Sequence, residues 1–308
     1  MALGKLNVPV LNREVSRLGM GSMIFCPDAR DLVFELLDTF HARGGNLIDA
    51  AQVYYGGLSE KAIGMYFGER GNRADWVLID KGCEQRSNVH RQGIRDAIAC
   101  NLERVQTDAI DLWMSHRDNP ETPVEEIIDT LNEEVQAGRI RAFGGSNWTV
   151  KRLREANEYA LRNGLIPMAA SSPHVCLTTA KEPFWADCTQ ASDEDVAWYA
   201  GQDMVVFAWS SQGRGFFLDS SGSDDSSGDL PRVYHNKANF EKLRRARELA
   251  AEKGVEPIQI ALAYVLNLPA PIAALVGPAS VAEIDSCVAA SSLALTPEEL
   301  DWLALRTA

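Results

Sequence analysis

The sequence lacks the cysteine patterns of zinc sites and disulfide frameworks. Its six cysteines are scattered, with no CxxC pair and no cluster of histidine and cysteine at metal-ligand spacing. Structural zinc is held by closely spaced thiolates and imidazoles, and disulfide-rich domains concentrate many cysteines in a short chain. We therefore expect no metal site, and we expect the cysteines to be small core residues or free thiols.

Long apolar runs and basic clusters are also missing. No segment is apolar for long enough to cross a bilayer, and the first ten residues, MALGKLNVPV, lack the basic and apolar regions of a signal peptide. Lysine and arginine total 30 against 43 aspartates and glutamates, which gives a formal net charge of −13. The sequence predicts a cytoplasmic protein whose partner is a small molecule, with no nucleic acid or membrane involved. A monomer and a homo-oligomer both stay open.

What the sequence has is a regular alternation of strand-like and helix-like segments. Strand-like runs lie at 16–22, 46–51, 76–80, 109–116, 140–147, 166–173, 204–211 and 271–277. Apolar residues at helical spacing cover 30–45, 59–67, 91–104, 122–138, 150–163, 192–202, 240–253, 257–267, 280–291 and the segment from residue 296 onward.

This alternation favours an α/β fold in which eight strand–helix units close into a (β/α)8 TIM barrel. Strands that alternate with helices form a parallel sheet buried on both faces, and eight units in 308 residues match a single barrel domain spanning 1–308. The alternative is an open doubly wound sheet. No G-x-G-x-x-G motif follows a strand, and GMGSM at 19–23 is only a weak match, so a Rossmann site is not favoured.

Local patterns predict two helix starts and one loop. Thr122, Pro123 and Glu125 form a capping-box pattern, and Ser59 is placed to cap the helix that follows it. The segment LDSSGSDDSSGDLP, residues 218–231, is rich in serine, glycine and aspartate and should be a mobile loop at the carboxyl face. A passive insertion and a cover over a ligand are equally compatible with its composition.

Four ionisable residues lie where consecutive strands end. Asp49 ends the second strand and Tyr54 follows it, Lys81 ends the third in WVLIDKG, and His116 ends the fourth in AIDLWMSH. In this fold the carboxyl ends of the strands carry the chemistry, so the four side chains should converge. Each alone has an ordinary explanation, such as turn capping or solvation, but the four together indicate a catalytic site.

The four residues suit proton transfer to a carbonyl oxygen. A tyrosine with a pKa of about 10 is a weak acid at neutral pH, and a neighbouring ammonium lowers that pKa. We expect Lys81 and Asp49 to lower the pKa of Tyr54 while His116 orients the carbonyl. No good nucleophile or metal cluster accompanies them, so the electrons require a separate hydride cofactor.

With NLIDAAQVYYGGLSE, WVLIDKG, AIDLWMSH and FGGSN, the chain resembles the aldo-keto reductase superfamily, from RLGMGS to ALVGPAS. Asp49, Ala51 and Tyr54 match its D-x-A-x-x-Y signature. The resemblance implies a (β/α)8 barrel, an Asp/Tyr/Lys/His tetrad with tyrosine as general acid/base, and a cofactor bound without a Rossmann domain. It implies NAD(P)H-dependent interconversion of an aldehyde or ketone and an alcohol, with Tyr54 as the general acid/base.

The resemblance also implies which residues hold the cofactor. Near the nicotinamide would lie Gly21, Ser22, Met23 and Asp49 at the ribose, Ser146 and Asn147 at the carboxamide, Ser171 or Ser172 in place of the family's glutamine, and Trp209 stacked on the ring. Farther along would lie Ser210, Ser211, Gln212, Gly213 and Arg214 at the pyrophosphate, then Gly277, Ala279, Ser280 and Glu283 after the eighth strand.

One departure from the family pattern bears on the choice of cofactor. Many members have an arginine after the eighth strand that holds the 2′-phosphate of NADP, and here that position is Ala279, followed by Glu283. Arginine is the favoured bidentate partner of phosphate, so its absence makes NAD plausible. A basic residue from elsewhere would compensate, and NADP(H) is narrowly favoured over NAD(H).

Two other function classes compete with an oxidoreductase. A non-catalytic NAD(P)-binding regulatory subunit on the same barrel, like the potassium-channel β-subunits, would not need a complete tetrad. A barrel glycosidase would use Asp49 and a second carboxylate. It would leave Tyr54, Lys81, Ser146 and Asn147 without roles.

Aromatic residues near the strand ends are candidates for substrate contact. They are Phe25, Tyr55, Trp148, His174 and Trp185. Aromatic rings with a few polar groups suit a sugar-like or polycyclic carbonyl compound, whereas ordinary packing explains the same residues equally well. The family spacing selects Tyr54 as the acid, so Tyr55 is expected at the rim of the pocket.

Overall fold

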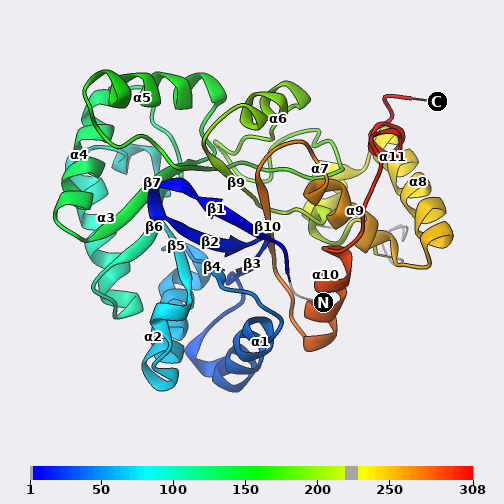
Figure 1. Ribbon diagram of the computed structural model, residues 1–308, viewed down its shortest axis with the longest axis horizontal. Coiled ribbons are helices and arrows are strands. Elements are labelled where there is room, and N and C mark those ends of the chain that lie inside the picture. Colours follow the sequence, from blue (N-terminus) through cyan, green and yellow to red (C-terminus); the bar gives the residue numbers. More distant parts are fainter. Residues whose placement is uncertain (1–2, 219–227, 308) are drawn as a thin grey trace.

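The computed structural model, which describes residues 3–218 and 228–307, contains a closed barrel of eight parallel strands. Around the barrel the strand order is β10-β3-β4-β5-β6-β7-β8-β9. Helices surround it, and the hairpin of β1 (Lys5–Val8) and β2 (Arg13–Ser16) lies across one end (Figure 1). The predicted (β/α)8 barrel is therefore confirmed, and the open doubly wound sheet is wrong. That one domain takes in all of 1–308 stays a prediction.

The barrel strands are short and buried on both faces. They are β3 (Leu18–Gly21), β4 (Leu47–Asp49), β5 (Val77–Gly82), β6 (Ile110–Ser115), β7 (Ile140–Ser146), β8 (Ala170–Ser172), β9 (Val205–Ala208) and β10 (Ile272–Val276). Every residue of β5 and β6 is buried, because the barrel interior covers one face and the helices cover the other. Asp80 and Lys81 of β5 are consequently buried charged residues that need partners.

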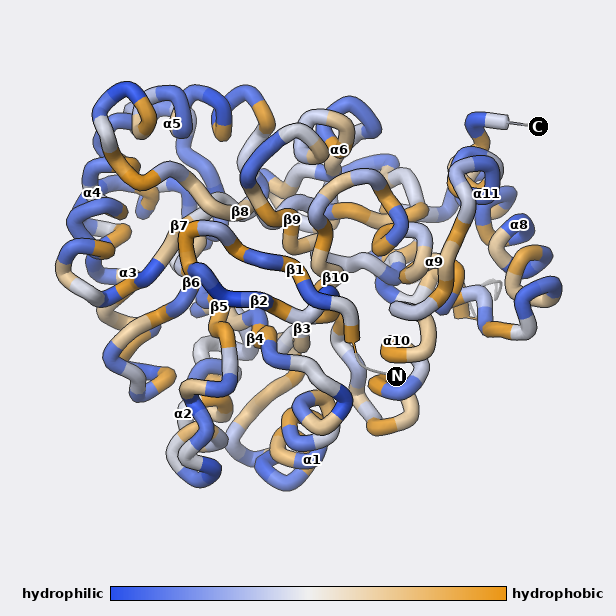
Figure 2. Tube along the Cα trace, viewed as in Figure 1, coloured by the Kyte–Doolittle hydropathy of each residue, from blue (hydrophilic) through white to orange (hydrophobic). Residues whose placement is uncertain are grey.

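Several of the helices begin where a polar side chain accepts from one of their first N–H groups. They are α1 (Arg30–Ala42), α2 (Leu58–Arg70), α3 (Arg91–Val105), α4 (Val124–Gln136), α5 (Val150–Arg162), α6 (Asp193–Ala200), α7 (Asp229–Tyr234), α8 (Lys237–Lys253), α9 (Pro257–Leu266), α10 (Val281–Ala290) and α11 (Pro297–Leu303). Thr149, Ser192 and Thr296 each accept a hydrogen bond from the residue three positions later. The outer segments of α4, α5 and α8 are largely hydrophilic (Figure 2). No helix in the described ranges is long and apolar enough to span a bilayer.

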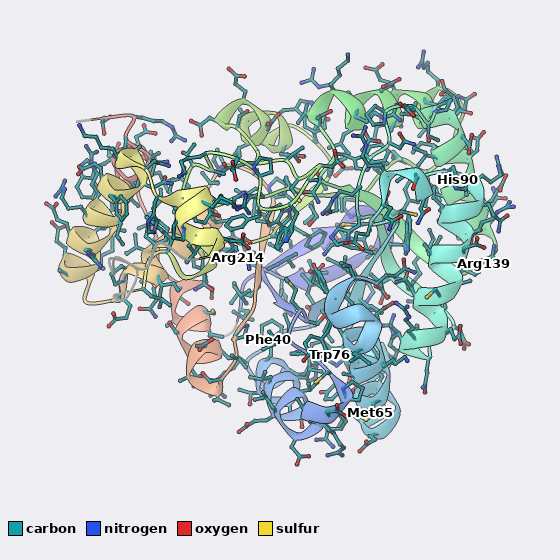
Figure 3. The ribbon with its side chains drawn as sticks, turned by 180° about the vertical axis from the view of Figure 1, so that it is seen from behind. Phe40, Met65, Trp76, His90, Arg139 and Arg214 are labelled. Atoms are coloured by element: carbon teal, nitrogen blue, oxygen red, sulfur yellow. The ribbon has the colours of Figure 1, made fainter. Side chains whose placement is uncertain are left out.

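Apolar side chains form two separate layers. The inner layer fills the barrel, with Leu47 and Phe207 from the strands and Val15 from the hairpin. The outer layer lies between strands and helices, where the rings of Phe40 and Trp76 stack with centroids 6.4 Å apart (Figure 3). Because the hairpin covers the amino end of the barrel, the carboxyl ends of the strands remain as the face on which a site can form.

Two elements lie outside the set that the sequence predicted. The N-terminal hairpin pairs Lys5 with Ser16 in antiparallel register, although its short segments carry little strand signal. Helix α7 begins at Asp229, so the last three residues of the predicted loop 218–231 are helical. The greater part of that loop, 219–227, lies outside the described residues, so a passive insertion and a ligand cover both stay open.

The two predicted caps are wrong, because Ser59 is the second residue inside α2 and Thr122 lies one residue before the N-cap of α4. Ser59 donates to Ser22 Oγ at 2.6 Å, and α2 has no side-chain cap. Thr122 donates to the carbonyl of Val89 at 2.6 Å, and the residue before α4 is Pro123. The pattern located both helix starts to within about two residues, the usual uncertainty of such boundaries, but not these hydrogen bonds.

Parallel register brings the predicted site residues to one edge of the barrel. Gly21 pairs with Asp49, and Ser146 pairs with Ser172. Lys81 lies on β5, two residues beyond the partner of Asp49. Since parallel strands end on the same face, these side chains meet at the carboxyl edge, as the strand-end argument predicted.

Helix α2 offers a matched pair of glycines that tests the outer layer. A Cβ on Gly64 would come within 2.6 Å of the carbonyl oxygen of Val105, whereas a Cβ on Gly68 would meet no atom within 4 Å. We expect Gly64→Ala to lower the free energy of unfolding by about 1–3 kcal/mol, because α2 must move away from α3. Gly68→Ala should raise it by up to about 1 kcal/mol through helix propensity. Urea unfolding measures both, and equal effects would contradict the packing.

Candidate active site

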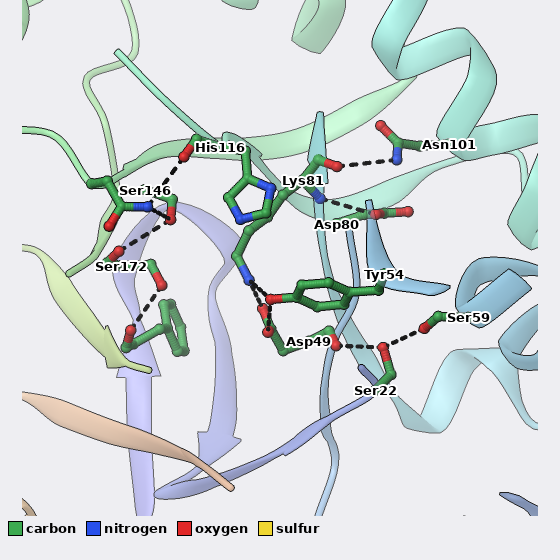
Figure 4. A network of polar contacts seen from close by, with 12 residues as sticks. Ser22, Asp49, Tyr54, Ser59, Asp80, Lys81, Asn101, His116, Ser146 and Ser172 are labelled. Carbon is green, nitrogen blue, oxygen red and sulfur yellow. Dashed lines mark hydrogen bonds and ion pairs between the residues drawn. The ribbon is translucent and has the colours of Figure 1, made fainter. Parts of the chain in front are cut away.

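Asp49, Tyr54 and Lys81 form one hydrogen-bonded group at the carboxyl end of the barrel (Figure 4). The Lys81 ammonium donates to Asp49 Oδ1 and, at 3.2 Å, to Tyr54 Oη. The Tyr54 hydroxyl donates to Asp49 Oδ2 at 3.2 Å. Asp49 and Lys81 are both buried, and two charges removed from water are stable only when each has close partners. The group thus holds a phenol between a carboxylate and an ammonium.

A tight turn carries Tyr54 over this ion pair. Turn η3 (Tyr54–Gly57) contains Tyr55 at φ 50° and Gly56 at φ 64°, both left-handed. Successive left-handed residues reverse the chain sharply. Tyr55 is consequently 60% exposed, and Tyr54 is the tyrosine beside Asp49 and Lys81.

Arg104 of α3 holds the loop that carries Tyr54. Its guanidinium donates to the carbonyl of Gln52 at 3.3 Å and pairs with Glu60 at 2.8 Å. Asn101 also donates to Glu60 at 2.8 Å, so both oxygens of this buried carboxylate have partners. A Cβ on Gly57 would come within 2.5 Å of the Arg104 guanidinium, so only glycine permits this approach.

Two serines hold the backbone of Asp49. Ser22 donates to the Asp49 carbonyl through its N–H at 3.1 Å and its hydroxyl at 2.8 Å, and Ser59 donates to Ser22 Oγ (Figure 4). Of the other residues predicted at the ribose, Gly21 packs against β10 and Met23 is exposed. Ser22 therefore has a definite structural role, and the exposed part of this loop is Met23 with the next residue, Ile24.

Burial dominates the electrostatics of the three groups. Burial, and then the Asp49 charge, raise the pKa of Tyr54 to about 12, against the opposing effect of Lys81. Burial also raises the pKa of Asp49, while the Lys81 ammonium opposes this. Burial lowers the pKa of Lys81, but Asp49 and Tyr54 together outweigh it and leave that pKa raised. The prediction that Lys81 and Asp49 lower the Tyr54 pKa is wrong, because Asp49 acts in the opposite direction and desolvation of the phenolate is larger.

His116 lies beside Tyr54 as a neutral imidazole. The two ring centroids are 6.0 Å apart with the planes at 85°. Burial, and then the charges of Lys81 and Arg117, lower the pKa of His116 well below its usual value. Its Nδ1 is buried and has no partner among the described residues. Since a neutral imidazole has one N–H donor and one acceptor nitrogen, His116 has polar atoms available to a ligand.

Ser146, Asn147 and Ser172 form a second hydrogen-bonded group next to His116. Asn147 Nδ2 donates to the His116 carbonyl and to Ser146 Oγ, both at 3.2 Å. Ser146 Oγ donates to the Ser172 carbonyl at 3.1 Å, and Ser172 Oγ donates to the carbonyl of Phe207 at 2.9 Å. The structure thus brings the three predicted carboxamide residues together. To donate to a ligand, the Ser172 hydroxyl would have to give up its hydrogen bond to the Phe207 carbonyl.

Trp209, which directly follows β9, has one face covered. The ring of His174 stacks on it with centroids 4.5 Å apart and planes at 17°. His174 is held in turn by the hydroxyl of Tyr234, 2.7 Å from its Nε2, and by the thiol of Cys176 at 3.1 Å. His174, predicted as a substrate contact, is therefore mainly a buried support for Trp209. A nicotinamide that stacks on Trp209 must use the opposite face.

A cavity of about 200 Å³ lies between Trp209 and the loop after β8. Its wall includes the rings of His174, Phe184 and Trp209 and the polar side chains of Thr189 and Gln190. Within the described ranges, the indole N–H of Trp209 and the hydroxyl of Thr189 are buried without partners. Unpartnered polar atoms are costly, so these two point to polar ligand atoms at this cavity.

The loop after Trp209, predicted at the pyrophosphate, is built from left-handed residues. Ser210 and Arg214 both have φ 52°, and Gly213 has φ 62°. Ser211 is buried and donates to the carbonyl of Leu275 at 2.9 Å. Repeated left-handed turns expose successive backbone N–H groups, a geometry that suits an anion such as a phosphate.

The structure separates the remaining predicted substrate contacts into two classes. Phe25 and Trp148 are fully buried in the core, which speaks against a substrate role, because a packed ring has no surface left for a ligand. Trp185 is 39% exposed, and the Arg214 guanidinium lies 5.1 Å from its ring centroid and 5.0 Å from that of Phe184.

The start of α10 and Gln212 lie at the far end of the predicted cofactor path. Glu283 Oε2 accepts from the N–H of Ala279 at 2.9 Å, and Ser280 Oγ accepts from the N–H of Glu283 at 3.3 Å. Gln212 Oε1 accepts from a cysteine thiol of α10 at 3.6 Å. Gly277 and Ala279 are exposed. The carboxylate of Glu283 thus occupies the amino end of α10.

Three residues that shape the site were not predicted from the sequence. Ser59 and Arg104 act through partners that only the fold brings near, so no local pattern identifies them. Arg117 directly follows His116 in SHRDN and is nearly buried. A cation next to a strand-end histidine was a signal that could have found it.

A model of the Aldo/keto reductase family matches residues 17–304. Norsolorinic acid reductase of Aspergillus flavus is 28% identical, with 93% of this chain and 76% of the relative covered. An aryl-alcohol dehydrogenase of Pestalotiopsis microspora is 26% identical, with 93% and 75% covered.

Solved structures share the fold. A thermostable aldo-keto reductase crystallised with the inhibitor epalrestat is 22% identical, has a TM-score of 0.76 and is covered over 99% of both chains. An aldo-keto reductase from Klebsiella pneumoniae in complex with NADPH is 19% identical and has a TM-score of 0.75, with 99% of this chain and 95% of that chain covered. At these identities the likeness concerns the barrel alone.

The lowered pKa of His116 predicts how this residue responds to pH. In the folded protein the ring stays neutral, whereas the unfolded chain takes up this proton below pH about 6.5. The free energy of unfolding should therefore fall as the pH drops below about 6.5, by at most about 1.4 kcal/mol per pH unit for this one proton. His116→Gln should remove that part of the slope.

Proton NMR of the ring checks the same point directly. The Cε1–H signal that is absent in His116→Gln should not shift between about pH 5.5 and 8, where an ordinary histidine titrates. A full titration with a midpoint of about 6.5 would contradict the buried, neutral imidazole.

Proposed function

This chain belongs to the aldo/keto reductase family and is an NAD(P)-dependent oxidoreductase, and we propose that it interconverts an aldehyde or ketone and an alcohol with Tyr54 as the general acid/base. One observation carries the proposal. The Tyr54 hydroxyl lies 3.2 Å from both Asp49 Oδ2 and Lys81 Nζ at the carboxyl face of the barrel. A regulatory subunit without catalysis has no use for a phenol held between a buried acid and a buried cation.

The electrostatics support a proton that moves only when charge develops on the substrate. With its pKa raised to about 12, Tyr54 is a neutral phenol at physiological pH and so carries the proton needed for reduction. As negative charge builds on the carbonyl oxygen, the phenol donates its proton to that oxygen. The Lys81 ammonium at 3.2 Å stabilises the resulting phenolate, and Asp49 keeps Lys81 charged. Alcohol oxidation uses the phenolate as a base.

His116 and the neighbouring amide support orientation of the reactants. A neutral His116 can donate an N–H to the carbonyl oxygen without competing with Tyr54 as an acid, because its pKa is far below neutrality. Asn147 Nδ2 donates a hydrogen bond to the His116 carbonyl at 3.2 Å, so a movement of one residue displaces the other. The positions of His116 and Asn147 are thus coupled through the backbone that directly follows β6.

The residues present fit a nicotinamide cofactor, which supplies the hydride when bound. Among the described residues Trp209 offers one ring face and an unpartnered N–H, and Asn147 is bonded both to the His116 carbonyl and to Ser146 Oγ. The left-handed loop that contains Arg214 suits a pyrophosphate. These features support cofactor use across the carboxyl face, and no separate nucleotide domain is needed.

We keep NADP(H) narrowly ahead of NAD(H) as the cofactor. The NADPH complex of the Klebsiella pneumoniae protein supports NADP(H). Glu283 opposes it, since its carboxylate accepts from the Ala279 N–H at the amino end of α10, where the family's phosphate-binding arginine is missing. A negative charge there disfavours the 2′-phosphate that distinguishes NADP from NAD.

An aromatic carbonyl compound is the substrate class that we favour. The names norsolorinic acid reductase and aryl-alcohol dehydrogenase support it. Two exposed rings at the site, Tyr55 and Trp185, can stack on an aromatic substrate. This narrows the predicted sugar-like or polycyclic carbonyl to one with an aromatic ring.

Tyr54→Phe and Tyr55→Phe form a matched pair of variants. Loss of the Tyr54 hydroxyl should lower kcat for aldehyde reduction by about 10²–10⁴-fold, because the general acid is gone. The dissociation constant of NADPH should be unchanged. Loss of the exposed Tyr55 hydroxyl should change kcat by no more than about twofold. Near-normal turnover of Tyr54→Phe with intact cofactor binding would show that the assignment is wrong.

Glu283→Gln tests the basis of cofactor choice. Glutamine keeps the acceptor for the Ala279 N–H but removes the charge, so NADPH binding should tighten by about two- to fivefold relative to NADH. Parallel fluorescence titrations with NADPH and NADH measure both constants. Asp285→Asn, an exposed acid on the same helix, is the control and should leave the ratio unchanged. If Glu283→Gln leaves the ratio of the NADPH and NADH dissociation constants unchanged, Glu283 does not influence the choice of cofactor.

A further inference from the structure

Arg117 is a nearly buried guanidinium next to His116. It is 8% exposed, its Nε donates to the carbonyl of Ala186 at 3.2 Å, and its Nη1 donates to the carbonyl of His116 at 2.9 Å. Across the described residues Nη2 makes no hydrogen bond, and it is not among the atoms that are both fully buried and unpartnered. One nitrogen of this group therefore keeps its hydrogens for a partner that the protein does not supply.

Three other cations near His116 have carboxylate partners, whereas Arg214, which lies over the rings of Phe184 and Trp185, has none among the described residues. Lys81 pairs with Asp49, Arg86 pairs with Asp187 at 3.0 Å, and Arg152 pairs with Asp118 at 3.2 Å. Arg117 has no carboxylate partner within the part of the chain that the structure describes. A charge that is nine-tenths buried is costly unless it is paired, so an anion brought by a ligand would stabilise Arg117 strongly.

The charge of Arg117 reaches both the proton-transfer group and the cavity. It adds to burial and Lys81 in lowering the pKa of His116. It also opposes the rise that burial causes in the pKa of Cys188, a residue of the cavity wall. Its bond to Ala186 ties it to the loop whose preceding residue is the exposed Trp185. Arg117 is thus placed between the histidine that faces the carbonyl and an aromatic wall.

We infer that Arg117 recognises a carboxylate on the substrate, so that the preferred substrates are aromatic aldehydes or ketones that also carry a carboxylate. The inference rests on the proposed carbonyl reduction and specifies its substrate. A guanidinium is planar, always charged at physiological pH and rich in donors, which makes it the side chain best matched to a carboxylate. Because Nε and Nη1 are already bound to carbonyls, the substrate's carboxylate is held chiefly by Nη2.

A pair of substrates that differ only in charge tests this inference. We would compare 4-formylbenzoate with its methyl ester, using the intact protein, NADPH and steady-state kinetics. In the wild type the KM for 4-formylbenzoate should be at least about tenfold lower than that for the ester, with similar kcat values. Arg117→Gln should abolish the difference by raising the KM for the anion alone, and Arg117→Lys should retain part of it.

Arg86→Gln is the matched control. Arg86 lies near the same loop, but its charge is already paired with Asp187 on the surface, so its loss should leave the preference for the anion in place. Urea unfolding of each variant checks that the fold is retained. If Arg117→Gln raises the KM of both substrates by the same factor, Arg117 only holds the backbone carbonyls of His116 and Ala186, and the inference is overturned.

The remaining outcomes separate this inference from the proposed function. If the wild type reduces both compounds with the same KM, carbonyl reduction stands and carboxylate recognition is overturned. If it binds NADPH but reduces neither these compounds nor any other aldehyde, the proposed function itself fails and the inference fails with it.

Discussion

The buried ion pair between Lys81 and Asp49 is the interaction on which the rest of the site depends. Burying either charge without a partner would be too costly, so each charge requires the other and a set of surrounding hydrogen bonds. Tyr54 completes that set by donating to one partner and accepting from the other. Ser22 holds the Asp49 backbone, and Arg104 holds the loop that carries Tyr54. Much of the polar structure at this end of the barrel thus serves to keep one phenol in place.

The sequence allowed the barrel and the convergence of the four ionisable residues to be predicted, because both follow from strand spacing and from chemistry at strand ends. It did not allow prediction of what depends on burial. The pKa of Tyr54 is raised, since desolvation of the phenolate outweighs Lys81. Phe25 and Trp148 turned out to be core residues, because an aromatic ring near a strand end looks the same in sequence whether it faces solvent or packing. The cap predicted at Ser59 failed because α2 begins one residue earlier, at Leu58, and the Ser59 hydroxyl instead donates to Ser22.

Arg117 has no carboxylate partner among the described residues, although the net charge of the chain is −13. Lys81 is balanced by Asp49, and burial, followed by the charges of Lys81 and Arg117, keeps His116 neutral. In the proposed function, a neutral His116 leaves Tyr54 to deliver the proton, and Arg117 selects the ligand. Lys81, which would stabilise the phenolate of Tyr54, and Arg117 lie at the neighbouring strand ends of β5 and β6, and both charges act on His116.

The most direct test of this account is a crystal structure of the protein with oxidised cofactor and a bound carbonyl ligand. The account predicts that the carbonyl oxygen accepts a hydrogen bond from Tyr54 Oη at about 2.7 Å, with His116 as its second neighbour and the Lys81–Asp49 pair intact. A carbonyl oxygen held by other groups, with Tyr54 turned away from it, would contradict the central claim that the phenol supplies the proton.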